Sequence, residues 1–575
     1  MTDLNPPASR TTTRRDVIKG TAISLASSAA WMSVPTKLHA APETDHKYPA
    51  LAPATADTVS AADDSPVVEL TSGKIRGYQR RGIFTFKGIP YADTTAGSNR
   101  FLQPQKLKPW TGVRSSMQFG DVCPQPPRAG WKNDEEAWLF SWDDGVPGED
   151  CLRVNVWTPG IHGGKRAVMV WLHGGGFTAG SGQELLSYDG ENLSRRGNVV
   201  VVSLNHRLNV FGFLNLSKFS GKYQESVNVG MLDIVAALEW VRDNIAAFGG
   251  DANLVTIFGQ SGGGGKVNAL MAMPAAKGLF HRAIVESGSL LKGVAQEQSE
   301  ALTDSYLKKL GLDATTIDKL QEIPFDQLEA ASVAVTTRTR PASGIIDFRR
   351  VGSQLGWAPV VDGKTLPRHP FDPDAPSQSA NIPLLVGTTL NEFLTATNHP
   401  EYMAMTEEEL QSRVKSAFGD KAPGIIQAAK GIYPNAVPFQ LWSIIGTSSV
   451  RGQALTQARL KAAQGGAPAF VYQFAWQTPV LNGRPMAFHC SEIAFVFDNT
   501  DRCENMTGGG KAARDLAEKV SEAWISFAKK GDPNHPGLPH WDLYSEKNSP
   551  TMIFDQQCGL RNEFDKQLQE IVANT

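Results

Sequence analysis

The sequence has little net charge and few long apolar runs, and both absences exclude classes of function. Its 56 lysines and arginines nearly balance its 58 aspartates and glutamates, which gives a formal net charge of −2. No basic cluster stands out, so nucleic-acid binding is disfavoured. No uninterrupted run of about 18 apolar residues occurs, so we expect neither a membrane-spanning helix nor a stable membrane anchor.

Metal motifs and repeats are also missing. The chain contains neither H-E-x-x-H nor paired C-x-x-C motifs, and it shows no internal repeat. We therefore expect no metal and no organic cofactor. Only five cysteines are present, and an odd number leaves at least one thiol outside any set of intramolecular disulfides.

The segments that are present predict an α/β protein with a large core. The chain has 575 residues, of which 41% are hydrophobic. Apolar residues recur at helical spacing over residues 233–247, and this segment ends at Gly249-Gly250, which predicts a helix. Residues 167–172 and 198–204 are mostly apolar runs, typical of strands buried in a parallel sheet.

The most informative segment is Gly259-Gln260-Ser261-Gly262-Gly263, which follows a β-rich stretch. A serine between glycines at this spacing is typical of a nucleophile elbow, a sharp strand-to-helix turn that exposes the hydroxyl. Side chains at the glycine positions would clash with neighbouring backbone. Because ordinary glycine-rich turns share the pattern, its interpretation depends on the rest of the chain.

A second glycine loop supplies that context. The predicted strand 167–172 runs directly into His173-Gly174-Gly175-Gly176. Backbone N–H groups of such a loop can approach a developing oxyanion. We therefore expect Gly175 and Gly176, together with Gly262 after the serine, to form an oxyanion hole.

The partners of an elbow serine follow it in the chain, first an acid and then a histidine. Of the 11 histidines, His489 fits best, since it lies in a loop between an apolar strand and a later helix. His281 and His540 fit less well. The acid has two candidates, because Glu392 follows a short apolar strand and a glycine turn, and Asp362 follows another apolar segment.

Three further segments, taken together with these motifs, indicate a protein family. They are Phe86-Lys87-Gly88-Ile89-Pro90-Tyr91-Ala92, Glu149-Asp150-Cys151-Leu152 and Gly531-Asp532-Pro533-Asn534. With the elbow and the glycine loop, they resemble the type-B carboxylesterase and cholinesterase family from Ser65 to Asp555. The resemblance implies an α/β-hydrolase fold with a central, mostly parallel sheet, flanking helices, and loop and helical excursions around an active-site gorge. It also implies one domain over residues 65–575.

The acid of that family is the glutamate of a G-x-x-x-x-E segment, which matches Gly387 to Glu392 and favours Glu392 over Asp362. The resemblance implies a triad of Ser261, Glu392 and His489 that hydrolyses carboxylic esters of small molecules through an acyl-enzyme. Amide, carbamate and lactone hydrolysis would use the same groups. A non-catalytic binding module on the same fold is disfavoured, because every catalytic group is present.

One departure from the family concerns its G-E-S-A-G elbow. Gln260 replaces the glutamate and Gly262 replaces the alanine. In cholinesterases that glutamate helps to hold a cationic substrate. We therefore expect Gln260 to lie at the substrate site and choline esters to be poor substrates. The run of glycines predicts close packing beneath the serine.

Two charged residues near these motifs, Lys266 and Glu492, could have either a functional or a structural role. Lys266 either reaches an anionic group of the substrate or, as is more usual for a lysine near a helix start, is a solvated surface residue. Glu492 follows His489 by three positions, and we expect it to be a structural hydrogen-bond partner rather than the catalytic acid.

The first residues predict export from a bacterial cell. Thr13-Arg14-Arg15-Asp16 precedes a moderately apolar stretch and a Leu38-His39-Ala40 cleavage-like site, which is typical of a twin-arginine signal. We expect residues 1–40 to be a signal peptide and residues 41–64 a disordered leader. The mature enzyme would then be periplasmic or secreted.

An oxidising compartment favours disulfides. The resemblance implies a bridge between Cys123 and Cys151. A second, weaker pair is Cys490 with Cys503, which would leave Cys558 unpaired, and Cys503 with Cys558 is the alternative.

The segment enclosed by the first pair carries Trp131, Trp138 and Trp142. In the resembling enzymes the corresponding loop forms a wall of the gorge, so we expect one of these tryptophans, with Trp138 and Trp142 as candidates, to contact the substrate. The alternative is that they only hold the loop against the core. We expect substrate preference to depend also on loops 343–357 and 434–451.

Overall fold

The computed structural model describes residues 58–62, 65–127, 134–336 and 356–574. All of these residues belong to one compact unit. The predicted signal peptide (1–40) lies outside the described residues, as do most of the predicted leader (41–64), Trp131 and most of the predicted substrate loop 343–357.

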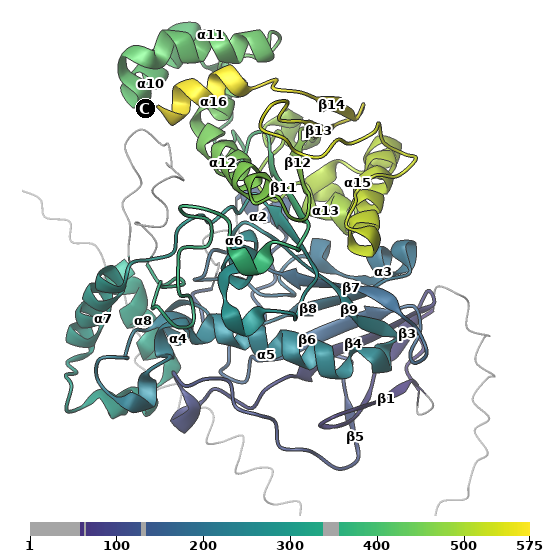
Figure 1. Cartoon of the computed structure of the whole chain (residues 1–575), viewed down its shortest axis with the longest axis vertical. Helices are drawn as coiled ribbons and strands as arrows, with labels where there is room; N and C mark the ends of the chain where they lie inside the picture. The colour runs from purple at the N-terminus through teal and green to yellow at the C-terminus, as the bar shows by residue number, and fades with distance from the viewer. Residues whose placement is uncertain (1–57, 63–64, 128–133, 337–355, 575) are drawn as a thin grey trace, which may run out of the picture. The chain divides into compact units, whose positions relative to one another are not determined.

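An 11-stranded sheet with the order β14-β13-β12-β11-β10-β9-β7-β8-β6-β4-β3 forms the centre of this unit (Figure 1). Its strands are β3 (Tyr78–Arg80), β4 (Ile83–Pro90), β6 (Arg153–Thr158), β7 (Arg166–Leu172), β8 (Val200–Leu204), β9 (Gly250–Gln260), β10 (Arg282–Glu286), β11 (Leu384–Thr389), β12 (Ala469–Phe474), β13 (Thr551–Phe554) and β14 (Gly559–Arg561). A second sheet contains β1 (Val67–Leu70), β2 (Gly73–Arg76) and β5 (Val113–Ser115).

The middle of the large sheet is parallel. The parallel pairs are β8 with β7, β7 with β9, and then each neighbour in turn from β9 to β13. The outer strands β3, β4, β6 and β14 pair antiparallel. The chain thus has the α/β-hydrolase fold that the motifs implied.

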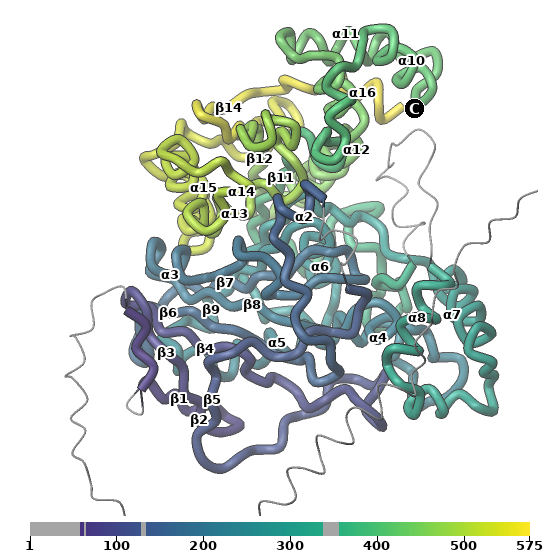
Figure 2. The backbone as a smooth tube through the Cα atoms, turned by 180° about the vertical axis from the view of Figure 1, so that it is seen from behind, coloured from purple at the N-terminus to yellow at the C-terminus, as the bar shows by residue number. Residues whose placement is uncertain are grey.

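The helices cover both faces of the sheet (Figures 1 and 2). They are α2 (Glu135–Phe140), α3 (Glu191–Gly197), α4 (Asn209–Phe213), α5 (Val229–Asn244), α6 (Gly262–Ala272), α7 (Gln296–Leu310), α8 (Phe325–Thr336), α10 (Glu407–Phe418), α11 (Ala422–Ile432), α12 (Pro438–Ala463), α13 (Ile493–Val496), α14 (Glu504–Thr507), α15 (Gly510–Lys530) and α16 (Lys566–Ala573). A smaller cluster of buried residues joins α10, α11, α12 and α16, which lie together in both views.

Strand β7 shows why the sheet strands are apolar throughout. Val168 and Val170 pack into the core that contains α5 and α6, whereas Met169 and Trp171 pack into the core that contains α3 and α15. Successive side chains of a strand point to opposite faces, and helices cover both faces here. Alternation of apolar and polar residues is therefore absent from the sequence of β7.

Three expected boundaries need correction. The strand expected over 198–204 begins at Val200, because Asn198 adopts a left-handed conformation (φ 47°) at the end of α3. The helix expected over 233–247 is α5, which begins at Val229 and passes into a 3-10 turn that ends before Gly249. The expectation of a loop over residues 434–451 was wrong for most of this range, since helix α12 begins at Pro438. Its poor helix formers, such as Gly446 and Thr447, are buried, and tertiary packing overrides their weak propensity.

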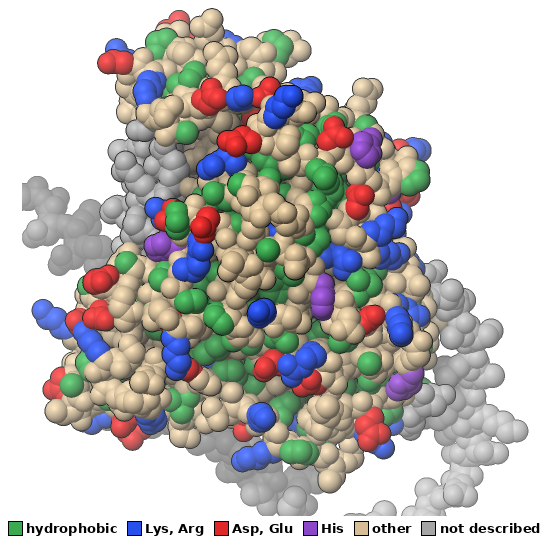
Figure 3. Space-filling model, viewed as in Figure 1, with side chains coloured by type: hydrophobic (Ala, Val, Ile, Leu, Met, Phe, Trp, Pro, Cys, Tyr) green, Lys and Arg blue, Asp and Glu red, His purple; other side chains and the backbone are tan. Residues whose placement is uncertain are grey.

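The surface carries charges of both signs. On the face drawn in Figure 3, lysine and arginine side chains are interspersed with aspartate and glutamate side chains. Within the part of the chain that the structure describes, none of the helices combines the length and apolar character that a bilayer crossing requires.

A buried ion pair ties α5 to the loop that follows β8. Arg207 and Asp233 are 2% and 0% exposed. The guanidinium donates from Nη2 to Oδ1 (2.7 Å) and from Nε to Oδ2 (2.8 Å), and the backbone N–H of Arg207 also donates to Oδ2 (3.0 Å). Three hydrogen bonds to one carboxylate offset the cost of burying both charges.

We predict that Asp233→Asn lowers the free energy of unfolding by about 3 to 5 kcal/mol, because it leaves the Arg207 guanidinium buried without its counter-charge. Urea unfolding followed by tryptophan fluorescence measures the change. Asp515→Asn is the control, since its partner Lys511 is an exposed neighbour on α15 and the pair should contribute little. Equal shifts in the two variants would contradict the prediction.

Candidate active site

Four segments that carry the predicted site residues meet at the carboxyl edge of the parallel sheet. Strand β7 runs into His173, β9 into Ser261, and β11 into the turn with Glu392, while β12 precedes the loop with His489. Carboxyl ends of parallel strands share one edge of a sheet, so residues far apart in sequence come together there.

Ser261 occupies the turn between β9 and α6. Its backbone has φ 57° and ψ −123°, a strained combination for a residue with a side chain. Two hydrogen bonds hold this geometry. The Ser261 N–H donates to the carbonyl of Glu286 at the end of β10 (2.7 Å), and the Gly265 N–H donates to the Ser261 carbonyl (3.1 Å). The serine therefore sits on the elbow that its sequence predicts.

The glycines of the elbow permit close backbone approach. A Cβ atom at residue 262 would lie 2.1 Å from the carbonyl oxygen of Gly176, and one at residue 263 would lie 2.0 Å from that of Leu172. Both distances are far inside van der Waals contact, so neither position accepts a side chain without moving the glycine loop. This packing explains why alanine does not stand at position 262.

His489 and Glu392 are joined by side chain and backbone. His489 Nδ1 lies 2.5 Å from Glu392 Oε2, and the His489 N–H donates to the Glu392 carbonyl (2.9 Å). The glutamate is 1% exposed and the imidazole side chain 11%. Because a carboxylate only accepts, Nδ1 is the donor and Nε2 is the basic nitrogen of the neutral ring.

Gln260 contacts the same imidazole. Its amide Nε2 lies 3.2 Å from His489 Nε2 and 3.3 Å from Nδ1, and its Oε1 accepts a hydrogen bond from the Cys490 thiol (3.1 Å). An amide nitrogen only donates, so a bond to Nε2 agrees with a proton on Nδ1. The side chain predicted at the substrate site thus lies against the histidine.

Two further carboxyl groups are buried close to Glu392. Burial raises the pKa of Glu286 to about 8, although the hydrogen bond from Trp524 Nε1 (2.7 Å) lowers it. The pKa of Glu492 is raised well above its usual range, first by burial and then by the charges of Glu286 and Glu392. Burial therefore favours the neutral form of both groups beside Glu392.

The glycine loop after β7 contains two residues with left-handed backbone conformation. Gly175 and Gly176 have φ of 79° and 64°. The carbonyls of the same peptide groups are bonded elsewhere, because His173 Nδ1 donates to the Gly174 oxygen (2.9 Å) and the Ala179 N–H donates to the Gly175 oxygen (3.1 Å). The two N–H groups remain directed away from those partners.

Ser261, Glu392 and His489 line one cavity of about 370 Å³ together with the glycine loop. Aromatic side chains form much of its wall. Phe140 stacks on Trp142 (ring centroids 4.7 Å apart) and meets Phe488 edge-on (5.5 Å), and the Phe393 ring lies 3.8 Å from the His489 ring. The full lining is Glu136, Leu139, Phe140, Trp142, Gly174, Gly175, Gly176, Glu184, Tyr188, Gln260, Ser261, Glu392, Phe393, Thr395, Thr397, Phe488, His489 and Cys490.

The alternative acid, Asp362, and the alternative histidines, His281 and His540, are not among the residues that line this cavity. Asp362 accepts hydrogen bonds from Asn228 Nδ2 (3.0 Å) and from the N–H groups of Lys364 (3.0 Å) and Leu366 (2.9 Å), and so stabilises a turn. His281 Nδ1 accepts from the Val255 N–H (3.2 Å) at the start of β10. His540 contacts Asp542 at the surface.

Of the two predicted tryptophans that the structure describes, Trp138 and Trp142, only Trp142 lines the cavity. Trp138 is 50% exposed and is absent from the described lining. Sequence reasoning also missed four aromatic residues, Phe140, Phe393, Phe488 and Tyr188. Phe393 and Phe488 adjoin Glu392 and His489 in the chain, and that adjacency was an available signal. Tyr188 offered none, because it comes from a turn with no motif.

Two expectations from the sequence were wrong. Lys266 is not solvated, because it is fully buried in the first turns of α6 and donates from Nζ to the His173 carbonyl (2.8 Å). The bridge between Cys123 and Cys151 is not formed, and both are free buried thiols. They hydrogen-bond to each other, and Cys123 Sγ accepts from the Leu208 N–H (3.2 Å), so non-covalent contacts satisfy both sulfur atoms.

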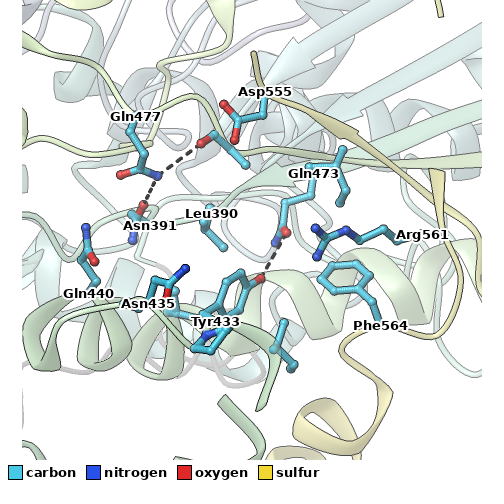
Figure 4. A pocket seen from close by; sticks show the side chains of 16 residues that line it. Leu390, Asn391, Tyr433, Asn435, Gln440, Gln473, Gln477, Asp555, Arg561 and Phe564 are labelled. Atoms are coloured by element: carbon cyan, nitrogen blue, oxygen red, sulfur yellow. Dashed lines mark hydrogen bonds between the residues drawn. The ribbon is translucent and has the colours of Figure 1, made fainter. Parts of the chain in front are cut away.

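A second cavity of about 370 Å³ is lined in part by Leu390 and Asn391, which directly precede Glu392 in the chain (Figure 4). Asn391 contributes to its wall and accepts a hydrogen bond from Gln477 (3.2 Å), and the Tyr433 hydroxyl donates to Gln473 (3.4 Å). None of the described residues that line it is a serine, cysteine or histidine, so it lacks the groups for acyl transfer.

Comparisons with known proteins agree with this geometry. A model of the carboxylesterase family matches residues 64–571. The para-nitrobenzyl esterase of Bacillus subtilis (strain 168) is 36% identical over 504 residues, which cover 86% of this chain and 96% of that protein.

Solved structures give the same result. An esterase from Clostridium hathewayi that can hydrolyse aliphatic aromatic polyesters superposes with a TM-score of 0.76 at 37% identity, over 89% of this chain and 99% of its own. A Geobacillus stearothermophilus carboxylesterase superposes with a TM-score of 0.72 at 35% identity, over 88% and 99% of the two chains. The chain therefore belongs to the carboxylesterase family, and it is a serine hydrolase of carboxylic esters.

Proposed function

We propose that Ser261, His489 and Glu392 form the catalytic triad, that Gly175, Gly176 and Gly262 form the oxyanion hole, and that the substrates are esters with a flat aromatic group. One observation carries this proposal. The serine on the strained elbow, the histidine bonded to a buried glutamate, and the glycine loop line a single cavity with aromatic walls.

The chemistry runs in two halves. Ser261 Oγ attacks the ester carbonyl carbon while its proton passes to His489 Nε2, and Glu392 stabilises the charged imidazole through Nδ1. The histidine then returns the proton to the oxygen of the departing alcohol. In the second half, water gives a proton to the histidine and attacks the acyl carbon, and Ser261 Oγ recovers the proton as the acid leaves. The N–H groups of the oxyanion hole stabilise both tetrahedral intermediates.

The aromatic wall supports the choice of substrate. Flat rings gain from stacked and edge-on contacts beyond the effect of buried area. The stack of Phe140 on Trp142 and the edge of Phe488 offer both kinds of contact. Two relatives, a para-nitrobenzyl esterase and an esterase that can hydrolyse aliphatic aromatic polyesters, are also named for esters with aromatic groups.

We also propose that the enzyme comes from a bacterium and that a twin-arginine signal over residues 1–40 exports it to the periplasm or the exterior. The support is the sequence Thr13-Arg14-Arg15-Asp16 with its apolar stretch and cleavage-like site.

We predict that Ser261→Ala abolishes hydrolysis of p-nitrophenyl and p-nitrobenzyl esters, because it removes the nucleophile. Initial rates for acyl chains from acetyl to decanoyl, and for benzyl against ethyl esters of one acid, measure the activity and the size of each pocket. The Gln440→Ala variant, in the second cavity, is the control and should keep wild-type rates. Activity that survived in a folded Ser261→Ala protein would disprove the triad, and no preference for benzyl over ethyl esters would disprove the aromatic proposal.

We predict that Glu392→Gln lowers kcat by about 10⁴-fold, because the amide neither stabilises the charged imidazole nor holds the correct tautomer. Glu492→Gln is the matched comparison. Since burial favours the neutral form of the Glu492 carboxyl, a neutral amide of the same shape should change kcat little. Steady-state kinetics of both variants test the assignment, and a collapse of kcat in Glu492→Gln with full activity in Glu392→Gln would reverse it.

We predict that replacing Arg14 and Arg15 together by lysine leaves the precursor inside a bacterial host, because the twin-arginine pair is what the export pathway reads. Cell fractionation and immunoblotting of precursor and mature forms measure the result. Unchanged export of the double variant, or cytoplasmic retention of the wild type, would remove the proposal.

A further inference from the structure

Lys266 is a fully buried lysine directly beside the elbow, among glycines and apolar residues. A buried ammonium group is unfavourable unless specific contacts compensate for its lost hydration. Its Nζ donates to the carbonyl of His173, the first residue of the glycine loop, at 2.8 Å. It also faces the Phe177 ring, with Nζ 5.9 Å from the centroid.

The charged and titratable groups around Lys266 come from several elements. Glu184 is the negative group that acts on it, and it precedes Tyr188 in the segment after the glycine loop. The His173 and His206 rings stack (centroids 5.2 Å apart), and burial together with the Lys266 charge lowers the pKa of His206 well below its usual range. Arg207 is engaged by Asp233.

Lys266 connects to the oxyanion hole through two hydrogen bonds in series. The ammonium holds the His173 carbonyl, and the His173 ring donates to the Gly174 carbonyl (2.9 Å). The Gly174 carbonyl and the Gly175 N–H belong to one peptide group. A hydrogen bond to a peptide oxygen polarises that peptide and strengthens its N–H as a donor.

We propose that Lys266 is a positioning residue of the oxyanion hole: its buried ammonium group fixes His173 and supplies positive potential where negative charge develops on the ester oxygen. The inference rests on the proposed oxyanion hole of Gly175, Gly176 and Gly262. A preorganised charge in a water-excluded site stabilises a transition state without reorganisation during the reaction. Since the charge is absent from the ground-state carbonyl, the effect falls on kcat rather than on KM.

The same contacts give a pH dependence. Burial lowers the pKa of Lys266 to about 7, although Glu184 raises it. As the pH rises through this pKa, the group loses its proton and the positive potential disappears. Turnover should therefore fall on the alkaline side of the pH profile, and the binding of a compound that forms an oxyanion on Ser261 should weaken over the same range.

The test is Lys266→Met, which keeps the length of the side chain and removes the charge. Lys461→Met is the matched control, because Lys461 is also fully buried and donates to backbone carbonyls, those of Ser379 (2.8 Å) and Ala380 (2.9 Å). Circular dichroism and thermal unfolding check the fold. Steady-state kinetics from pH 5.5 to 9.5 and inhibition by an aryl trifluoromethyl ketone, which forms a tetrahedral oxyanion adduct with the serine, measure the effect.

We expect Lys266→Met to lower kcat by about tenfold or more and to weaken the binding of the ketone by a similar factor. The KM should change by less than about threefold. Its kcat should also lose the alkaline decline. Lys461→Met should keep the wild-type profile. A folded Lys266→Met protein with wild-type kcat and ketone affinity would overturn the proposal.

If the Lys266→Met variant does not fold, the pH dependence of ketone binding by the wild-type enzyme still tests the proposal. A ketone affinity that is constant from pH 6 to 9 would overturn the proposal, whereas an alkaline loss of affinity that Lys461→Met retains would support it. The result is separable from the proposed function. Loss of activity in Ser261→Ala with a normal Lys266→Met enzyme rejects the role of Lys266 alone, whereas an active Ser261→Ala enzyme rejects the triad itself.

Discussion

The close approach of two glycine backbones is the constraint on which the site depends. The start of α6 lies so near the loop after β7 that a single Cβ at residue 262 would overlap the Gly176 carbonyl. That contact fixes how closely the elbow and the glycine loop approach each other. His173, Gly174 and Lys266 are buried beside it, and their polar groups must find partners within the protein.

The carbonyl groups of the glycine loop have such partners. The His173 carbonyl takes its hydrogen bond from Lys266, the Gly174 carbonyl from the His173 ring, and the Gly175 carbonyl from the Ala179 N–H. With these carbonyls satisfied, the loop can hold its positive φ angles without help from a ligand. Rigidity of this kind matters for catalysis, because donors that are already oriented need no reorganisation when charge develops.

The sequence predicted the parts of this site that a local pattern defines, and missed those that depend on packing. The elbow, the glycine loop and the acid each follow a buried strand, so strand order alone brings Ser261, His173 and Glu392 to one edge. Lys266 was expected in solvent, because the sequence does not show that the glycines before it let the start of its helix pack closely against the core. The Cys123 and Cys151 bridge came from family resemblance, and their adjacency in the structure does not require a covalent bond. Helix α12 escaped prediction because its buried face, not its helix propensity, stabilises it.

In the proposed mechanism, the charges around Ser261 match the direction in which charge moves during the reaction. On one side, the Glu392 carboxylate contacts the His489 imidazole, and burial favours the neutral forms of the neighbouring Glu286 and Glu492. On the other side, Lys266 donates to the His173 carbonyl at the start of the proposed oxyanion loop. If all three glutamates were ionised, they would repel the developing oxyanion as well as attract the imidazolium. Burial of the two extra carboxyls therefore lets one negative charge act on the histidine while a positive charge acts on the opposite side of the serine.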